Sequence, residues 1–183
     1  MNGCGQGRAH DLRGNAGNDV ASQQQQAEAA LSKGATVLVL GSVDSEAAGQ
    51  IVTSAQGSGA KVISYDRLIK GESKPDYLVT FNNEYVGTLQ AQSLMAEFDA
   101  QGVTDPRLIW INGSSKTAES AVFEKGAKDA ISDTTTIVKL GEMPGWKPEE
   151  AQQLVEAQIA SGGADSFDGV LVANDGGAGG VFA

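Results

Sequence analysis

Short apolar runs of strand length alternate with longer segments of helical pattern along almost the whole chain. The expected strands cover residues 36–40, 61–65, 78–81, 107–111, 134–140 and 167–173, and the expected helices cover residues 19–31, 45–57, 84–100, 117–131, 148–160 and 176–183. This alternation predicts an α/β fold built from parallel sheets with right-handed crossovers. Aromatic residues make up only 5% of the chain, so Val, Ile, Leu and Ala dominate the expected core, as in parallel sheets that helices cover on both faces.

Polar residues follow the expected strands at their carboxyl ends. The pair Asp66-Arg67 comes directly after the run 61–65, and similar positions hold Asn82-Asn83, residues 112–115, Trp146 and Asn174-Asp175. In open α/β sheets, ligands bind at this edge. A carboxylate that accepts hydrogen bonds, next to a guanidinium that donates them, can bind the hydroxyls of a polyol. The alternative interpretation of Asp66-Arg67 is a surface ion pair at the end of a strand.

A break in the pattern divides the chain. Gly and Pro punctuate residues 101–106, after which the strand and helix pattern starts again. We therefore expect one lobe over residues 19–102 and a second over residues 103–183. Residues 1–18 form an irregular start, rich in Gly but with no preceding strand and no Lys-Ser/Thr ending, so a phosphate-binding loop is not indicated. A truncated or altered start is the expectation for this segment.

Charge and cysteine content exclude several function classes. The net charge is −10 with a pI near 4.4, and no Lys/Arg cluster stands out, so nucleic acid and anionic membrane surfaces are not expected partners. Cys4 is the only cysteine, which excludes an internal disulfide, and with His10 alone nearby it forms no metal-binding set. No run is long enough to span a bilayer, and we expect neither cofactor nor metal.

Four segments, taken in order, resemble one known family. They are Gln26 to Leu40, Val62 to Ile69 with its Tyr-Asp-Arg-Leu-Ile sequence, Phe81 to Gly87, and Val172 to Gly180 with its Ala-Asn-Asp-Gly sequence. The chain resembles the type I periplasmic binding proteins that serve bacterial ABC sugar transporters, most closely the D-xylose-binding type. The resemblance extends over nearly the whole chain from about Asn15.

The resemblance implies two α/β lobes that close on a monosaccharide, xylose or a similar pentose or hexose, with no catalysis. Arg67 matches the sugar-binding arginine of the family, Asp66 its neighbour, and Asn174 an asparagine on the opposite lobe. Trp146 matches a tryptophan that stacks on the sugar ring. At Glu119 the chain departs from the family, which has asparagine in that loop. A membrane permease is the implied partner, and the implied location is the periplasm or, with a lipid anchor, the cell exterior.

The two tryptophans are predicted to have different roles. Trp110 lies within an apolar strand and is expected in the core. Trp146 lies between Pro144 and Pro148 at the start of a helix, where a rigidly held indole can present a flat face to a sugar ring. The alternative is that the Trp146 indole fills the lobe beneath its loop.

Two other interpretations remain open at this stage. One is the effector-binding core of a LacI-type transcriptional regulator, which resembles the same fold but carries a helix-turn-helix that is not seen here. The other is an α/β enzyme acting on a sugar through Asp66, Glu84, Glu119 or Asp175, although no metal triad or nucleophile elbow accompanies these carboxylates. Family members also begin with a strand that nothing here matches and continue past Ala183, so the chain is expected to be a fragment.

Overall fold

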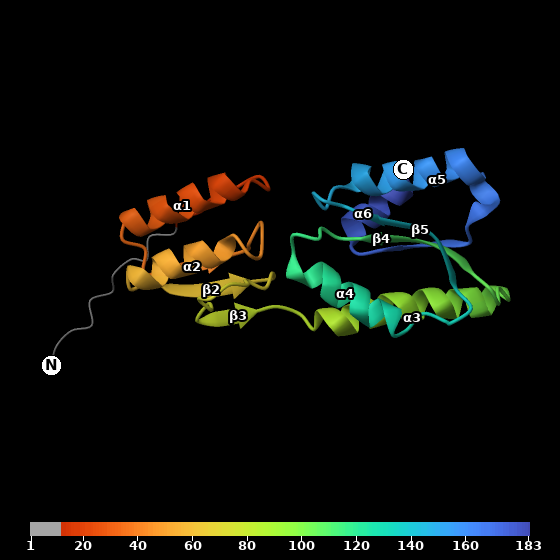
Figure 1. Ribbon diagram of the computed structural model, residues 1–183, viewed down its shortest axis with the longest axis horizontal. Helices are drawn as coiled ribbons and strands as arrows, with labels where there is room; N and C mark the ends of the chain where they lie inside the picture. The colour runs from red at the N-terminus through yellow and green to blue at the C-terminus, as the bar shows by residue number, and fades with distance from the viewer. Residues whose placement is uncertain (1–11) are drawn as a thin grey trace.

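The computed structural model describes residues 12–183 and contains two parallel β-sheets that lie side by side (Figure 1). The first sheet has the order β1-β2-β3, with β1 at Val37–Leu40, β2 at Lys61–Tyr65 and β3 at Tyr77–Val79. The second has the order β5-β4-β6, with β4 at Arg107–Asn112, β5 at Thr136–Glu142 and β6 at Gly169–Val172. The predicted α/β alternation with parallel strands is confirmed. Cys4, His10 and most of the irregular start lie outside the described residues.

The helices agree with the predicted segments to within a few residues. They are α1 (Val20–Ser32), α2 (Ala48–Gly57), α3 (Asn83–Gln101), α4 (Ala118–Lys128), α5 (Pro148–Gly162) and α6 (Asp175–Val181), with a 3-10 turn at Ala164–Ser166. Local signals explain the ends: Asp19 caps α1 by accepting from the Ser22 N–H, and Gly102 ends α3 in the left-handed conformation. Within residues 12–183, no helix has both the length and the apolar character needed to cross a membrane.

The second sheet is covered by helices on both faces. Leu108 and Trp110 of β4 pack into one cluster with residues of α3 and α4, whereas Ile109 and Ile111 pack on the opposite face with residues of α5. All four side chains are buried. Because successive residues of a strand point to opposite faces, this run is apolar without alternation, as expected for a strand buried on both sides.

The first sheet is covered by helices on one face. Leu40 of β1 and Val62 of β2 pack with α1 and α2 in a single core cluster, and Figure 1 shows both helices on the same side of the strands. On the other face, Val39, Tyr77 and Val79 are all more than half exposed. The expectation of helices on both faces is therefore correct for the second sheet and wrong for the described part of the first.

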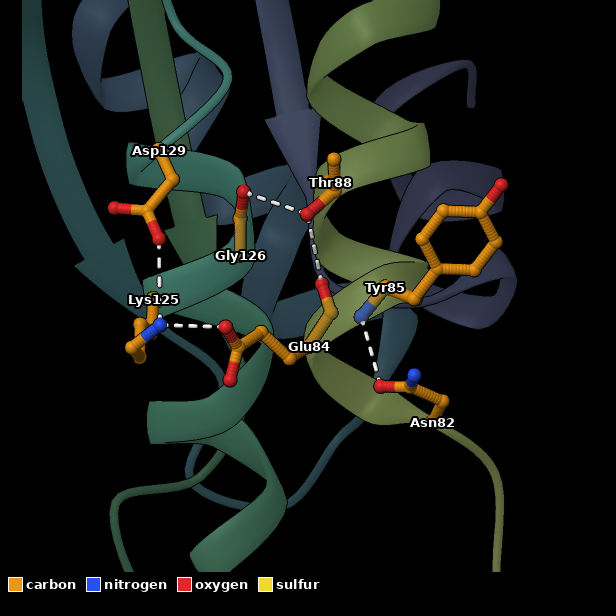
Figure 2. A network of polar contacts seen from close by, with 7 residues as sticks. All are labelled: Asn82, Glu84, Tyr85, Thr88, Lys125, Gly126 and Asp129. Atoms are coloured by element: carbon orange, nitrogen blue, oxygen red, sulfur yellow. Dashed lines mark hydrogen bonds and ion pairs between the residues drawn. The ribbon is translucent and has the colours of Figure 1, made fainter.

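Helix α3 corrects the expected lobe boundary at residues 102 and 103. Its residues Ala91 and Phe98 are buried in the same cluster as Leu108 of β4, so α3 packs on the second sheet. Figure 2 shows α3 against α4, where the Thr88 hydroxyl donates to the Gly126 carbonyl and Lys125 pairs with Glu84. The chain thus passes between the two groups of elements before α3, in the short segment that follows β3 (Figure 1).

The glycine-rich helix α6 packs closely on its neighbours. A Cβ on Gly180 would lie 2.0 Å from the Pro148 carbonyl oxygen, and one on Gly177 would lie 2.5 Å from the Met143 sulfur. These glycines therefore permit α6 to approach α5 and β6 more closely than any side chain would allow.

Candidate functional site

A cavity of about 310 Å³ lies between the carboxyl ends of the two sheets. It is lined by residues that follow β2, β3 and β6, together with residues from α3, α4 and the loop after β5. These residues are Asp66, Arg67, Phe81, Asn83, Val86, Glu119, Phe123, Trp146, Ala173 and Asn174. The volume falls at the lower end of the range for small-molecule sites.

Asp66 and Arg67 form a tight turn at the end of β2. Asp66 adopts a φ of 65°, an uncommon left-handed conformation for a residue other than glycine. Its backbone is anchored on both sides, since its N–H donates to the Val79 carbonyl and its carbonyl accepts from the Thr80 hydroxyl. The Asp66 carboxylate is exposed and makes no hydrogen bond within residues 12–183, so it is available to a ligand.

The Arg67 guanidinium reaches from the first lobe toward the second. Its Nη1 donates to the Ser42 carbonyl at 2.9 Å, and its Cζ lies over the Trp146 ring, 5.9 Å from the centroid. This distance is within the range of a cation–π contact. The remaining guanidinium donors stay available, and a ligand that packs on this face of the indole would take the place of the guanidinium.

Trp146 is fixed by its surroundings on the second lobe. Its backbone is left-handed, with φ of 58°, and its ring packs so closely on Gly113 that a Cβ there would lie 1.9 Å from Cη2. The Glu150 carboxylate supports the loop by accepting from the Gly145 and Lys147 N–H groups. Trp146 therefore lines the cavity and also contacts the core beneath it, and its stacking on a sugar stays a prediction.

Trp110 lies in the core of the second lobe, as predicted. Its side chain is 6% exposed, and its indole N–H donates to Asn112 Oδ1 at 2.7 Å. By contrast, the indole N–H of Trp146 is buried without a partner in the described part of the chain.

Glu119 lies in the first turn of α4, and its carboxylate crosses to the first lobe. One carboxylate oxygen accepts from the Leu68 N–H, directly after Arg67 in the chain. Two more bonds join the lobes nearby: the Ser45 N–H donates to the Lys116 carbonyl, and the Ser45 hydroxyl accepts from the Ala118 N–H, each at 3.1 Å. The start of α4 is thus docked on the loops of the first lobe.

Asn174 has a structural role that its position alone did not reveal. It caps α6, and its Oδ1 accepts from the Gly177 N–H at 2.8 Å. The side-chain amide nitrogen faces no such demand, so Asn174 can offer a ligand a donor more readily than an acceptor.

The structure therefore brings together all five residues that the sequence singled out: Asp66, Arg67, Glu119, Trp146 and Asn174. Arg67 and Asn174 reach the cavity from opposite lobes, while the binding role of each residue stays a prediction. The lining holds five further residues: Asn83, which the sequence analysis placed at a strand end without a binding role, and Phe81, Val86, Phe123 and Ala173, which it missed. Phe81 and Asn83 both follow the end of β3. Their position at a strand end is the sequence signal that indicates a place in the site.

Of the four carboxylates considered for catalysis, Asp66 and Glu119 line the cavity, whereas Glu84 and Asp175 do not. Glu84 lies outside the cavity lining and pairs with Lys125 at 2.5 Å (Figure 2), and Asp175 is also absent from the lining. Among residues 12–183, no group of three or more His, Cys, Asp or Glu side chains could hold a metal ion. Within the lining, Asp66 and Glu119 are the only carboxylates and Arg67 is the only cation.

Comparison with known proteins places this geometry in context. The family model described as "Periplasmic binding protein domain" matches residues 5–183. The chain is 31% identical over 172 residues to the multiple sugar-binding periplasmic receptor ChvE of Rhizobium radiobacter, covering 87% of this chain and 49% of that protein. It is 29% identical over 166 residues to the D-xylose-binding periplasmic protein of Escherichia coli K12, covering 88% and 48%. The chain spans about half the length of these curated relatives.

Solved structures show the same fold. An ABC transporter solute binding protein from Clostridium phytofermentans with bound β-D-glucose matches with a TM-score of 0.80 and 31% identity, over 91% of this chain and 56% of that chain. A Caulobacter myo-inositol binding protein matches with a TM-score of 0.78 over 89% and 54%, at 24% identity, which supports the fold alone. The predicted α/β fold with two parallel sheets flanked by helices is confirmed.

Proposed function

This chain belongs to the periplasmic binding protein domain family, and from that premise we propose that it binds a monosaccharide in the cavity between its two lobes. The observation that carries the proposal is the set of five residues from both lobes, Asp66, Arg67, Glu119, Trp146 and Asn174, around one cavity. Relatives in the family are named for sugar binding, which supports the same role here.

The lining suits a polyol chemically. Asp66 offers acceptor oxygens, whereas Arg67 and the amide nitrogen of Asn174 offer donors, so hydroxyls can both donate and accept. The indole of Trp146 and the ring of Phe123 provide apolar surface for the C–H faces of a sugar ring. This combination of a few placed polar groups within an apolar wall is typical of small-molecule sites.

We propose further that the sugar is a pentose or hexose such as xylose or glucose, and that the protein serves an ABC importer as its solute-binding component. In this role it delivers the sugar to a membrane permease from the periplasm or from the cell exterior, and it catalyses no reaction. The relatives' printed names, which refer to periplasmic receptors and to an ABC transporter solute binding protein, support this assignment.

Calorimetry with a panel of monosaccharides tests the proposal. D-xylose, D-glucose and myo-inositol are titrated into the wild-type chain, and saturable binding of at least one is expected. Arg67→Ala should weaken that binding by roughly 2–4 kcal/mol, because it removes a partly buried charged donor. Lys74→Ala, an exposed basic side chain of the same lobe outside the cavity, is the matched control. Absence of binding to the whole panel, or equal binding by Arg67→Ala, contradicts the proposal.

A further inference from the structure

Acidic side chains outnumber basic ones in the lining of the cavity. Asp66 and Glu119 bring carboxylates from opposite lobes, whereas Arg67 brings a guanidinium, and the described lining contains no Lys or His. Counted as formal charges, the lining therefore has an excess of one negative charge. The Asp66 side chain is exposed and accepts no hydrogen bond within residues 12–183. A ligand with a positive charge would balance this excess, whereas a neutral ligand would not.

The carboxylate of Glu119 is the buried part of this excess charge. Its side chain is 6% exposed; one oxygen accepts from the Leu68 N–H, and the other, Oε2, has no donor within the described residues. Arg67 does not neutralise it, since in the described part of the chain its guanidinium is directed to the Ser42 carbonyl and the Trp146 ring. Burial of an ionised group without a countercharge is costly. Glu119 is also the position at which the sequence departs from its family resemblance, where asparagine would be neutral, so this charge is a feature of this chain.

Aromatic side chains line the same cavity, namely Phe81, Phe123 and Trp146. A cation already lies on one of them, because the Arg67 Cζ is 5.9 Å from the centroid of the Trp146 ring. Aromatic faces attract cations through the negative potential above the ring. Carboxylates within an aromatic wall are therefore suited to an ammonium group, which combines a positive charge with N–H donors.

We propose that the ligand is an amino sugar, a monosaccharide on which a protonated amine takes the place of one hydroxyl. An ammonium group has three donors and no acceptor, so it pairs with the Asp66 carboxylate and with the free oxygen of Glu119. Such charge-assisted hydrogen bonds are about twice as strong as those between neutral groups. The remaining hydroxyls meet the donors of Arg67 and Asn174. This inference rests on the proposed monosaccharide site and names its substrate class; the alternative is that hydroxyls of a neutral sugar donate to both carboxylates.

Calorimetry with three related sugars tests the substrate class in the wild-type chain. D-glucosamine, D-glucose and N-acetyl-D-glucosamine are titrated at about pH 6, where an amine with the ordinary pKa of an α-amino group is protonated. D-glucosamine should bind at least about tenfold more tightly than D-glucose, the ratio expected when one hydrogen bond gains a charge. N-acetyl-D-glucosamine keeps the nitrogen without the charge and should show no such advantage. Equal or tighter binding of D-glucose overturns the proposal and leaves the monosaccharide site intact, whereas a failure of all three sugars to bind overturns both.

Substitutions that remove charge but keep shape test the two carboxylates. In Glu119→Gln, the ratio of D-glucosamine affinity to D-glucose affinity should fall about tenfold, because a buried charge is lost. In Asp66→Asn the ratio should fall less, because solvent screens an exposed carboxylate. Glu149→Gln, exposed in the first turn of α5 and outside the lining, is the matched control and should keep the wild-type ratio. A ratio that stays at the wild-type value in both cavity variants overturns the assignment of the ammonium to these carboxylates. The comparison of sugars in the wild type decides the substrate class even if a variant does not fold.

Discussion

The two lobes use the same βα pattern but bury their sheets to different extents. In the second lobe, β4 carries four consecutive buried residues between two core clusters, one on each face. In the first lobe, β2 alternates between buried and more exposed residues over a single cluster. Strand composition is nevertheless similar, since both sheets are rich in Val, Leu and Ile. The difference shows that burial on the second face depends on which helices pack there, and strand composition does not encode this.

The largest expected effect comes from comparing one strand residue in each lobe. Ile111→Ala should lower the free energy of unfolding by about 3 kcal/mol, because it leaves a cavity at a fully buried position. Val39→Ala on the uncovered face, where the side chain is 65% exposed, should change it by no more than about 0.5 kcal/mol. Urea denaturation followed by circular dichroism measures both. A large loss for Val39→Ala would mean that the outer face of the first sheet is covered after all.

The next effect tests whether α3 belongs to the second lobe. Gly126 of α4 faces α3 so closely that a Cβ would lie 1.8 Å from the Glu84 carbonyl oxygen (Figure 2). Gly126→Ala should therefore destabilise the protein by about 1–3 kcal/mol, as other overpacked sites do. The matched control is Gly57→Ala at the end of α2 in the first lobe, where a Cβ meets nothing within 4 Å. That change should be neutral or stabilise by up to about 1 kcal/mol. Equal stability of the two variants would contradict the close α3–α4 packing.

Much of the fold follows from the sequence because strands and helices leave local signals. The order of elements, the caps at Asp19 and Gly102 and the polar residues at strand ends depend on neighbours in the chain. The lobe boundary was not predicted correctly from the sequence. A helix pattern shows which face of α3 is apolar, but it does not show which sheet lies beneath that face. The Gly-Pro punctuation at residues 101–106 marks the end of a helix, and the boundary lies one element earlier.

The candidate site likewise contains some residues that the sequence predicts and others that it does not. Arg67 and Asn174 were predictable because the carboxyl ends of parallel strands converge at one edge of a sheet. Phe81 and Phe123 were missed because an aromatic residue near an apolar run resembles a core residue, and only the arrangement of the two lobes turns both rings toward the cavity. The cross-lobe bond of Glu119 connects residues 51 apart in sequence, a separation at which no periodic pattern gives information.

A smaller effect is expected from the two tryptophans, because Trp146 lines the cavity between the lobes whereas Trp110 lies in the core of the second lobe. The chain should show a sugar-dependent change in tryptophan fluorescence that is lost in Trp146→Leu and kept in Trp110→Phe. Loss of the indole should weaken binding by roughly 1–2 kcal/mol, comparable to other aromatic contacts. The sugar is expected to displace the Arg67 guanidinium from the ring, so the emission should also respond to Arg67→Ala without sugar. A full signal and unchanged affinity in Trp146→Leu would leave the indole with its packing role only.

The smallest expected effect is on the pH dependence of stability, and it is tested with one carboxylate in each lobe. The Lys61 ammonium and the Val62 N–H lower the pKa of Asp76 to about 2 in the first lobe. The Arg107 guanidinium and backbone N–H lower the pKa of Asp168 to about 2 in the second. Both values lie below the ordinary 3.8, so each ionised group stabilises its lobe above about pH 4, and this contribution is lost as the pH falls toward 2.

Asp76→Asn and Asp168→Asn should therefore each flatten the pH dependence of stability between about pH 4 and pH 2, by similar amounts. Each aspartate joins its strand to a neighbour, Asp76 from the start of β3 to β2 and Asp168 from the start of β6 to β4. Urea midpoints measured across this window for the wild type and the two variants make the comparison. Because the second sheet is packed on both faces, its unfolding should require higher urea at every pH, even though the two carboxylates titrate alike. The contrary result is a pH dependence that disappears in Asp168→Asn and persists unchanged in Asp76→Asn. That result would show that the first lobe is already unfolded in this pH range. The difference in burial between the lobes would then decide acid stability more than the ion pairs do.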